Sequence, residues 1–145
     1  MPVFEQVLEK YPQDVKVVFK NFPIRSHKFA IKAAVAALAA DSQGKFWEFH
    51  DLLFQNYNKL NDQKIQEIAQ TVGLNLEEYE KKKNDPAIER KVNQDFSDGR
   101  RAGVRGTPTV FINGIRLRDR SLQGFQTAID KQLQKLGKTA TKPAS

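Results

Sequence analysis

The stretch "VRGTPTVFINGIRLR", residues 104–118, contains the clearest structural signal in this chain. Thr109 to Ile112 is a β-branched and aromatic run, and Asn113-Gly114 is the strongest short-range signal for a hairpin turn. The second arm, Ile115 to Arg118, alternates apolar and basic residues, as a strand with one buried face does. The sequence therefore predicts a β-hairpin. Pro108, which has no N–H to give to a sheet ladder, stands immediately before its first strand.

Length and composition indicate one globular domain. The chain has 145 residues, of which 39% are hydrophobic and 28% charged, values typical of a folded domain of this size. No apolar run approaches the roughly 18 residues of a membrane span, so we expect no membrane segment. The first residues have neither the basic start nor the apolar core of a signal peptide.

The chain contains no cysteine, which excludes a disulfide, a thiol nucleophile and a thiolate metal site within these residues. The two histidines, His27 and His50, do not have the spacing of a metal-binding pair, and we expect both to be structural. The sequence therefore predicts no catalytic residue, no metal site and no cofactor.

Arginines that contribute to the net charge of +7 are concentrated in one segment. Residues 100–120 contain no lysine and six arginines: Arg100, Arg101, Arg105, Arg116, Arg118 and Arg120. Arginine suits bidentate recognition of phosphate or carboxylate groups. Because no recognition-helix motif and no interleaved aromatic platform accompany the arginines, a solvated basic face that attracts acidic clients is favoured over a nucleic-acid site.

The remaining sequence predicts one strand and a series of helices. Val15 to Phe19 is nearly continuous in apolar character and predicts an interior strand. Trp47, Phe46 and Phe49 could line a peptide groove, but their helical spacing favours packing in the core of the protein. The expected helices are residues 2–10, 29–40 and 46–54, a helix capped by Asn61 and ended by Gly73, a short helix after Asn75, a helix after Asp85 and a last one after Ser121.

Four segments carry a family resemblance: "VKVVFKNFP" (15–23), "QGKFWEFHDLLF" (43–54), "GLNLEEYE" (73–80) and "GVRGTPTVFING" (103–114). With them the chain resembles the DsbA-like thiol-disulfide oxidoreductases. The resemblance implies an α/β, thioredoxin-like fold with an inserted helical subdomain. It implies a single domain over residues 1–137 with the insertion at about 25–103, followed by a disordered tail at 138–145.

The same resemblance implies a substrate-binding segment and a location. The proline that matches Pro108 has a cis peptide bond in this family, and Gly106, Thr107 and Pro108 are expected to bind extended polypeptide substrates. The family also implies a periplasmic or other extracytoplasmic location.

The family's chemistry needs a Cys-x-x-Cys motif, which in relatives lies just before the segment matching residues 2–12. The chain lacks this motif and the strand before it, so as given it cannot catalyse thiol-disulfide exchange. Either it is a fragment or misassigned start of an ordinary oxidoreductase, which we favour, or it is a protein that has lost redox function. Because the missing strand would leave ladder groups unpaired, we expect a homo-oligomer formed by strand exchange.

Other functions stay open at this stage. One alternative is a non-catalytic peptide-binding or assembly module. Another is a relative of glutathione-dependent isomerases that share the inserted thioredoxin fold. The residue that would decide this is absent from the chain.

Overall fold

The structure, a computed structural model, describes residues 2–139 and divides the chain into two compact units. The helical unit is Lys20–Gly106, and the hairpin unit comprises Met1–Phe19 and Thr107–Ser145. Each unit has its own apolar core. The limits of the helical unit lie close to those expected for the insertion, at about 25–103. That both units form one domain stays a prediction.

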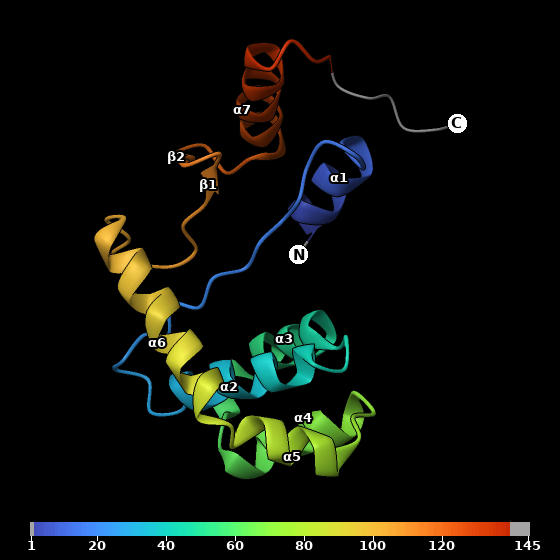
Figure 1. Ribbon diagram of the computed structural model, residues 1–145, viewed down its shortest axis with the longest axis vertical. Helices are drawn as coiled ribbons and strands as arrows, with labels where there is room; N and C mark the ends of the chain where they lie inside the picture. The colour runs from blue at the N-terminus through green and yellow to red at the C-terminus, as the bar shows by residue number, and fades with distance from the viewer. Residues whose placement is uncertain (1, 140–145) are drawn as a thin grey trace. The chain divides into compact units, whose positions relative to one another are not determined.

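An alanine-rich helix, α2 (Ala30–Asp41), organises the helical unit (Figure 1). It packs against α3, α5 and α6 and also contacts α4. Small side chains around most of its circumference allow neighbouring helices to approach closely from several directions. Its fully or nearly fully buried residues are Ala33, Ala36, Ala37, Ala39 and Ala40. The other helical elements are α3 (Phe46–Gln55), η1 (Tyr57–Lys59), α4 (Asp62–Thr71), α5 (Leu76–Lys83) and α6 (Pro86–Arg101).

Side chains at the predicted positions cap three of these helices. An oxygen of the Asn61 side chain accepts a hydrogen bond from the backbone N–H of Lys64 at 2.7 Å. Asn75 and Asp85 cap α5 and α6 through the backbone N–H groups of Glu78 and Ala87, at 3.1 and 2.9 Å. Each bond satisfies an N–H group that the first turn of a helix leaves without an internal partner. The predicted helix starts are confirmed here.

The described residues of the hairpin unit form two helices and a small sheet (Figure 1). Helix α1 (Pro2–Lys10) packs against α7 (Leu122–Lys135), and the strands β1 (Phe111–Ile112) and β2 (Ile115–Arg116) form an antiparallel pair. The buried residues of this core are Val7, Tyr11, Phe125, Ile129 and Leu133. The ring of Phe4 meets that of Phe125 edge to face, with centroids 5.4 Å apart.

The predicted interior strand at residues 15–19 is wrong. Residues 15–20 are neither helix nor strand, Val18 is 62% exposed and Phe19 is 38% exposed. A strand needs a neighbour to complete its hydrogen-bond ladder, and the sheet of the described residues contains only β1 and β2. An apolar run alone therefore does not make this segment a strand.

Two further expectations need correction. Phe46 and Phe49 lie in the core of the helical unit, but Trp47 between them is 47% exposed, because the residue following Phe46 points to a different side of α3. The hairpin strands are also shorter than the runs 109–112 and 115–118, and Ile115 is 55% exposed rather than buried.

The predicted tail lies only partly within the described residues. Lys138 and Thr139 are exposed and outside any helix or strand, and residues 140–145 lie outside the part of the chain that the structure describes. In residues 2–139, every helix is too short or too polar to cross a bilayer.

Candidate functional site

The hairpin turn has the backbone geometry that its sequence demands. Asn113 and Gly114 both have positive φ, at 48° and 80°, as a two-residue type I′ turn requires. The register pairs Phe111 with Arg116 and Ile112 with Ile115. One further backbone bond, from the N–H of Leu117 to the C=O of Val110 at 2.8 Å, continues the pairing beyond the strands.

Thr107 and Pro108 form the start of the polypeptide leading into this hairpin. Both are exposed, and the peptide bond between them is cis. Within residues 2–139, no backbone hydrogen bond engages the N–H or the C=O of Thr107. The C=O of Pro108 accepts a hydrogen bond from Nη1 of Arg120 at 2.7 Å. Gly106, the third predicted site residue, is the last residue of the helical unit, whereas Thr107 and Pro108 belong to the hairpin unit.

A hollow of about 390 Å³ adjoins this segment within the hairpin unit. Its lining consists of Pro108, Thr109, Arg116, Leu117, Arg118 and Arg120. Arg116, Leu117 and Arg118 follow one another along its wall, and of these three only Arg116 belongs to a strand, β2. The alternation of apolar and basic residues predicted a basic face for this arm, whereas no sequence pattern indicated the hollow itself.

Asp119, the acidic residue within this arginine run, accepts a hydrogen bond from the backbone. Oδ1 of Asp119 accepts a hydrogen bond from the backbone N–H of Ser121 at 2.9 Å, and this bond lowers the pKa of the Asp119 carboxyl. Ser121 in turn caps α7, its Oγ accepting from the N–H of Gly124 at 3.1 Å. In the described part of the chain, no ion pair and no side-chain hydrogen bond involves Arg116 or Arg118.

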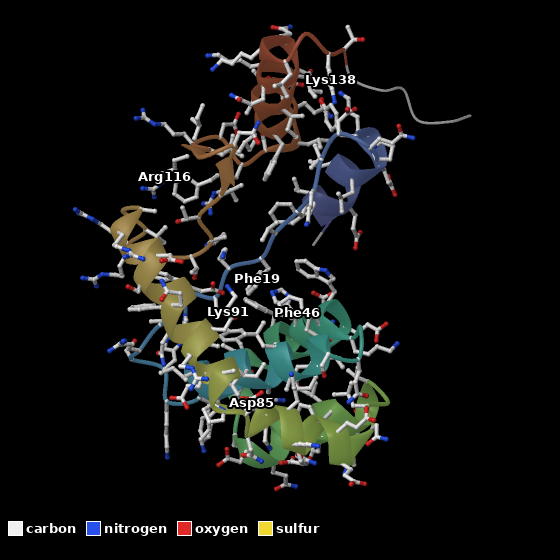
Figure 2. The ribbon with its side chains drawn as sticks, viewed as in Figure 1. Phe19, Phe46, Asp85, Lys91, Arg116 and Lys138 are labelled. Atoms are coloured by element: carbon white, nitrogen blue, oxygen red, sulfur yellow. The ribbon has the colours of Figure 1, made fainter. Side chains whose placement is uncertain are left out.

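Asp95 on α6 is a buried carboxylate, the one acidic side chain that is buried in residues 2–139, and it was not predicted from the sequence. It is 2% exposed and accepts hydrogen bonds from the N–H and Nδ2 of Asn21, at 3.1 and 3.0 Å. Nζ of Lys20 lies 3.4 Å from Oδ1, and Lys91 also bonds to this oxygen; Figure 2 shows Lys91 on α6. Burial would raise the pKa of Asp95, but the bonds from Lys91 and Asn21 outweigh it and lower that pKa. Asp95 therefore stays ionised and joins the start of the helical unit to α6.

The histidines lie in contrasting surroundings. His27 is exposed in the loop before α2. His50 is 5% exposed, lies against the rings of Phe46 and Phe54, and has Nδ1 3.1 Å from Oδ1 of Asp51. Among residues 2–139, no cluster of three or more potential ligands could hold a metal ion.

The order of elements along the chain defines a class: a helical segment, then a proline-led β-hairpin, then a C-terminal helix. Residues 1–130 match the model of the family described as DSBA-like thioredoxin domain, and the chain belongs to that family. The predicted family and fold are thereby confirmed: a DsbA-like thioredoxin fold, mostly helical, with a small two-stranded sheet.

A solved structure shares the fold. The chain is similar to the thiol-disulfide exchange protein alpha-DsbA2 from Wolbachia pipientis, with a TM-score of 0.75 and 24% sequence identity. The match covers 90% of this chain and 72% of that one. At this identity the likeness shows the fold alone.

The curated relatives carry a different name. The chain is 34% identical over 116 residues to the Na(+)/H(+) antiporter NhaA 3 of Salinispora tropica, a match that covers 79% of this chain and 18% of the antiporter. It is 31% identical over 108 residues to the Na(+)/H(+) antiporter NhaA of Herminiimonas arsenicoxydans, covering 74% of this chain and 17% of that protein. The chain thus spans about a fifth of the length of these relatives.

Proposed function

We propose that this chain is the polypeptide-binding part of a DsbA-like thiol-disulfide oxidoreductase domain, with Gly106, Thr107 and Pro108 holding an extended substrate. One observation carries the proposal: Thr107 is exposed and its backbone N–H and C=O are unpaired within the described residues. Such a backbone can pair with an extended peptide as a strand pairs at a sheet edge. Membership of the DSBA-like family supports this use of the segment.

The chain supplies binding but not the nucleophile. In thiol-disulfide exchange, a thiolate attacks one sulfur of a disulfide, forms a mixed disulfide and releases the other sulfur as a thiolate. These 145 residues contain no cysteine, so both thiols would have to come from outside them. What Thr107 and Pro108 contribute is the position and direction of the bound polypeptide.

Backbone pairing can be tested with N-methylated peptides. A fluorescent, extended peptide is titrated with the whole chain, and its anisotropy gives Kd. N-methylation removes one N–H donor, so methylation of the amide that pairs with Thr107 should weaken binding about fivefold to tenfold, in line with the loss of one hydrogen bond. Methylation of the next amide, which faces away, is the matched control.

A second arm tests the segment itself. Proline fixes φ and limits the freedom that binding would otherwise remove, so Pro108→Ala should weaken binding of the unmethylated peptide. Equal affinities for both methylated peptides, with no change in the amide NMR signal of Thr107, would refute pairing at this segment.

The antiporter relatives favour a second candidate, a non-catalytic module of a larger protein. The matched region makes up only 18% of the antiporter from Salinispora tropica, so a similar segment occurs there as one part of a longer chain. As an assembly module the chain would bind a folded partner, whereas the polypeptide-binding proposal requires an unfolded one. Comparing Kd for native and reduced, unfolded forms of the same test protein separates the two. A glutathione-dependent relative would instead show saturable binding of glutathione by calorimetry.

Self-association and location complete the proposal. We retain a homo-oligomer formed by strand exchange, because the two-stranded sheet is small and Ile115 and Phe111 are 55% and 38% exposed. A concentration-independent monomer by light scattering would contradict it.

An extracytoplasmic location follows from the family, and recovery of the protein in the cytoplasmic fraction of its source cells would contradict that.

A further inference from the structure

The lining of the hollow beside Pro108 carries positive charge and no acidic side chain. Three of its six lining residues are arginines and none is acidic. Arg116 and Arg118 have no ion pair in the described part of the chain, and Asp119 is hydrogen-bonded to the N–H of Ser121. Figure 2 shows Arg116 projecting from the hairpin. The hollow is therefore chemically suited to an anion.

One of the arginines of the hollow is already held in position. Nη1 of Arg120 donates to the C=O of Pro108 at 2.7 Å, which fixes one edge of its guanidinium and ties it to the proline segment. A guanidinium has five N–H donors, so Arg120 keeps donors for a ligand. Arg116 and Arg118, which flank Leu117 in the sequence, both line the hollow. Planar guanidinium groups match the two oxygens of a carboxylate in a bidentate geometry.

We propose that this hollow is a subsite for an acidic side chain, Asp or Glu, of the bound polypeptide. The inference rests on the proposed function, because it places the acidic side chain on a peptide that is paired with Thr107. A polypeptide is favoured over a nucleic acid for two reasons. Pro108 and Thr109 line the hollow directly, so a peptide along this segment passes beside it. None of the six lining residues is aromatic, so the hollow offers no platform on which bases could stack.

The test compares matched peptides on the whole chain. A fluorescent extended peptide carries one glutamate, moved through successive positions, and each version has a glutamine twin of the same size. At the best position, the glutamate peptide should bind about tenfold more tightly than its twin, the effect of charge-assisted hydrogen bonds. The double variant Arg116→Gln/Arg118→Gln should bring that ratio close to one. Circular dichroism and urea unfolding establish that the variant is folded.

A second double variant controls for net charge. Lys16→Gln/Lys138→Gln removes the same two charges from exposed lysines of the hairpin unit, and Figure 2 shows Lys138 beyond the C-terminal end of α7. This variant should keep the preference for glutamate. A ratio that collapses equally in both double variants would overturn the subsite in favour of diffuse attraction between charges.

The remaining outcomes separate the subsite from the function on which it rests. If every glutamate peptide binds like its glutamine twin, the subsite is refuted while polypeptide binding stands. If no peptide binds at all, both proposals fall. A DNA duplex that binds more tightly than the best glutamate peptide, and loses affinity in Arg116→Gln/Arg118→Gln, would overturn the assignment to a polypeptide in favour of nucleic acid.

Discussion

Two buried tyrosines show how differently the two units of this molecule are stabilised. Tyr11 in the hairpin unit and Tyr79 in the helical unit are both 0% exposed. The hydroxyl of Tyr11 donates to Oδ1 of Asp130 at 2.7 Å, whereas that of Tyr79 is buried without a hydrogen-bond partner among the described residues. Burial raises the pKa of both tyrosines, and for Tyr11 the bond to Asp130 adds to the effect.

The two units also differ in the size of their cores. Among the described residues, the core of the helical unit contains thirteen buried residues and that of the hairpin unit five. Since hydrophobic stabilisation grows with the apolar area removed from water, the larger core can offset the cost of an unpaired hydroxyl. The smaller core is supplemented by a polar bond between residues 119 positions apart in the sequence. We therefore expect apolar substitutions to dominate in one unit and polar ones to matter more in the other.

The largest expected effect is in the core of the helical unit. Phe49 is 0% exposed, and its ring centroid lies 6.0 Å from that of Tyr79. Phe49→Ala should lower the free energy of unfolding by about 3–5 kcal/mol, because it removes a buried ring and leaves a cavity. Urea unfolding, followed by the fluorescence of Trp47, the single tryptophan, measures this in the helical unit.

Phe54 on the same helix provides the matched control. Its side chain is 64% exposed, so Phe54→Ala should change the free energy of unfolding by less than about 0.5 kcal/mol. Equal costs for the two substitutions would mean that this core does not have the packing described, and the comparison of the units would fail.

The next effect concerns the polar cluster of the helical unit. Asp95→Asn removes the charge that pairs with Lys20 and Lys91 and weakens the bonds from Asn21. We expect a loss of about 2–3 kcal/mol at pH 7, the value of hydrogen bonds to a charged group. Urea titration again measures it. A loss below 1 kcal/mol would show that the exposed lysines and water replace these bonds.

The pH dependence of this cluster has a definite sign. The pKa of Asp95 is lowered in the folded state, so its contribution is fully present above its unfolded pKa of about 3.9 and is lost as the pH falls through the lower folded pKa. The free energy of unfolding should therefore decline below about pH 4, and less steeply in Asp95→Asn than in the wild type. Asp41→Asn, at an exposed carboxylate, should keep the wild-type decline.

Much of the fold could be predicted because it is encoded locally. The side chains of Asn61, Asn75, Asp85 and Ser121 cap helices from positions that the sequence alone indicates. The turn at residues 113–114 likewise needs only two residues with positive φ. Pairing of a strand is not local, and the segment 15–19 was predicted wrongly because its apolar run says nothing about a partner.

The site divides in the same way. The alternation of Arg116 and Arg118 with apolar residues predicted that they share a face of the second arm, but Leu117 lines the hollow as well. The hollow also depends on the hydrogen bond from Arg120 to the Pro108 carbonyl, which no sequence pattern reports. The position of Asp95 in the sequence could have indicated its role. It lies three residues after the buried Val92 and four after Lys91, so a carboxylate stood on the apolar face of α6 beside a basic partner.

The tyrosine pair tests the comparison directly. Tyr11→Phe removes the bond to Asp130 and should cost about 1.5 kcal/mol, whereas Tyr79→Phe removes an unpaired buried hydroxyl and should cost nothing or stabilise by up to about 1 kcal/mol. Native-state hydrogen exchange of α7 amides measures the first, and urea unfolding followed at Trp47 measures the second. Equal costs for the two substitutions would remove the distinction between the units.

The smallest expected losses of stability come from removing helix caps, and they test whether the two units unfold together. Asn61 and Ser121 each cap one helix, α4 in the helical unit and α7 in the hairpin unit. Replacing either by alanine should cost about 1 kcal/mol. Measured by hydrogen exchange, Asn61→Ala should lower the protection of α4 and its neighbours and leave α7 unchanged, and Ser121→Ala should do the reverse. Loss of protection in both units from either substitution would mean that they open as one cooperative block. In that case the large core of the helical unit would also stabilise the hairpin unit. The bond from Tyr11 to Asp130 would then not be needed to supplement the smaller core.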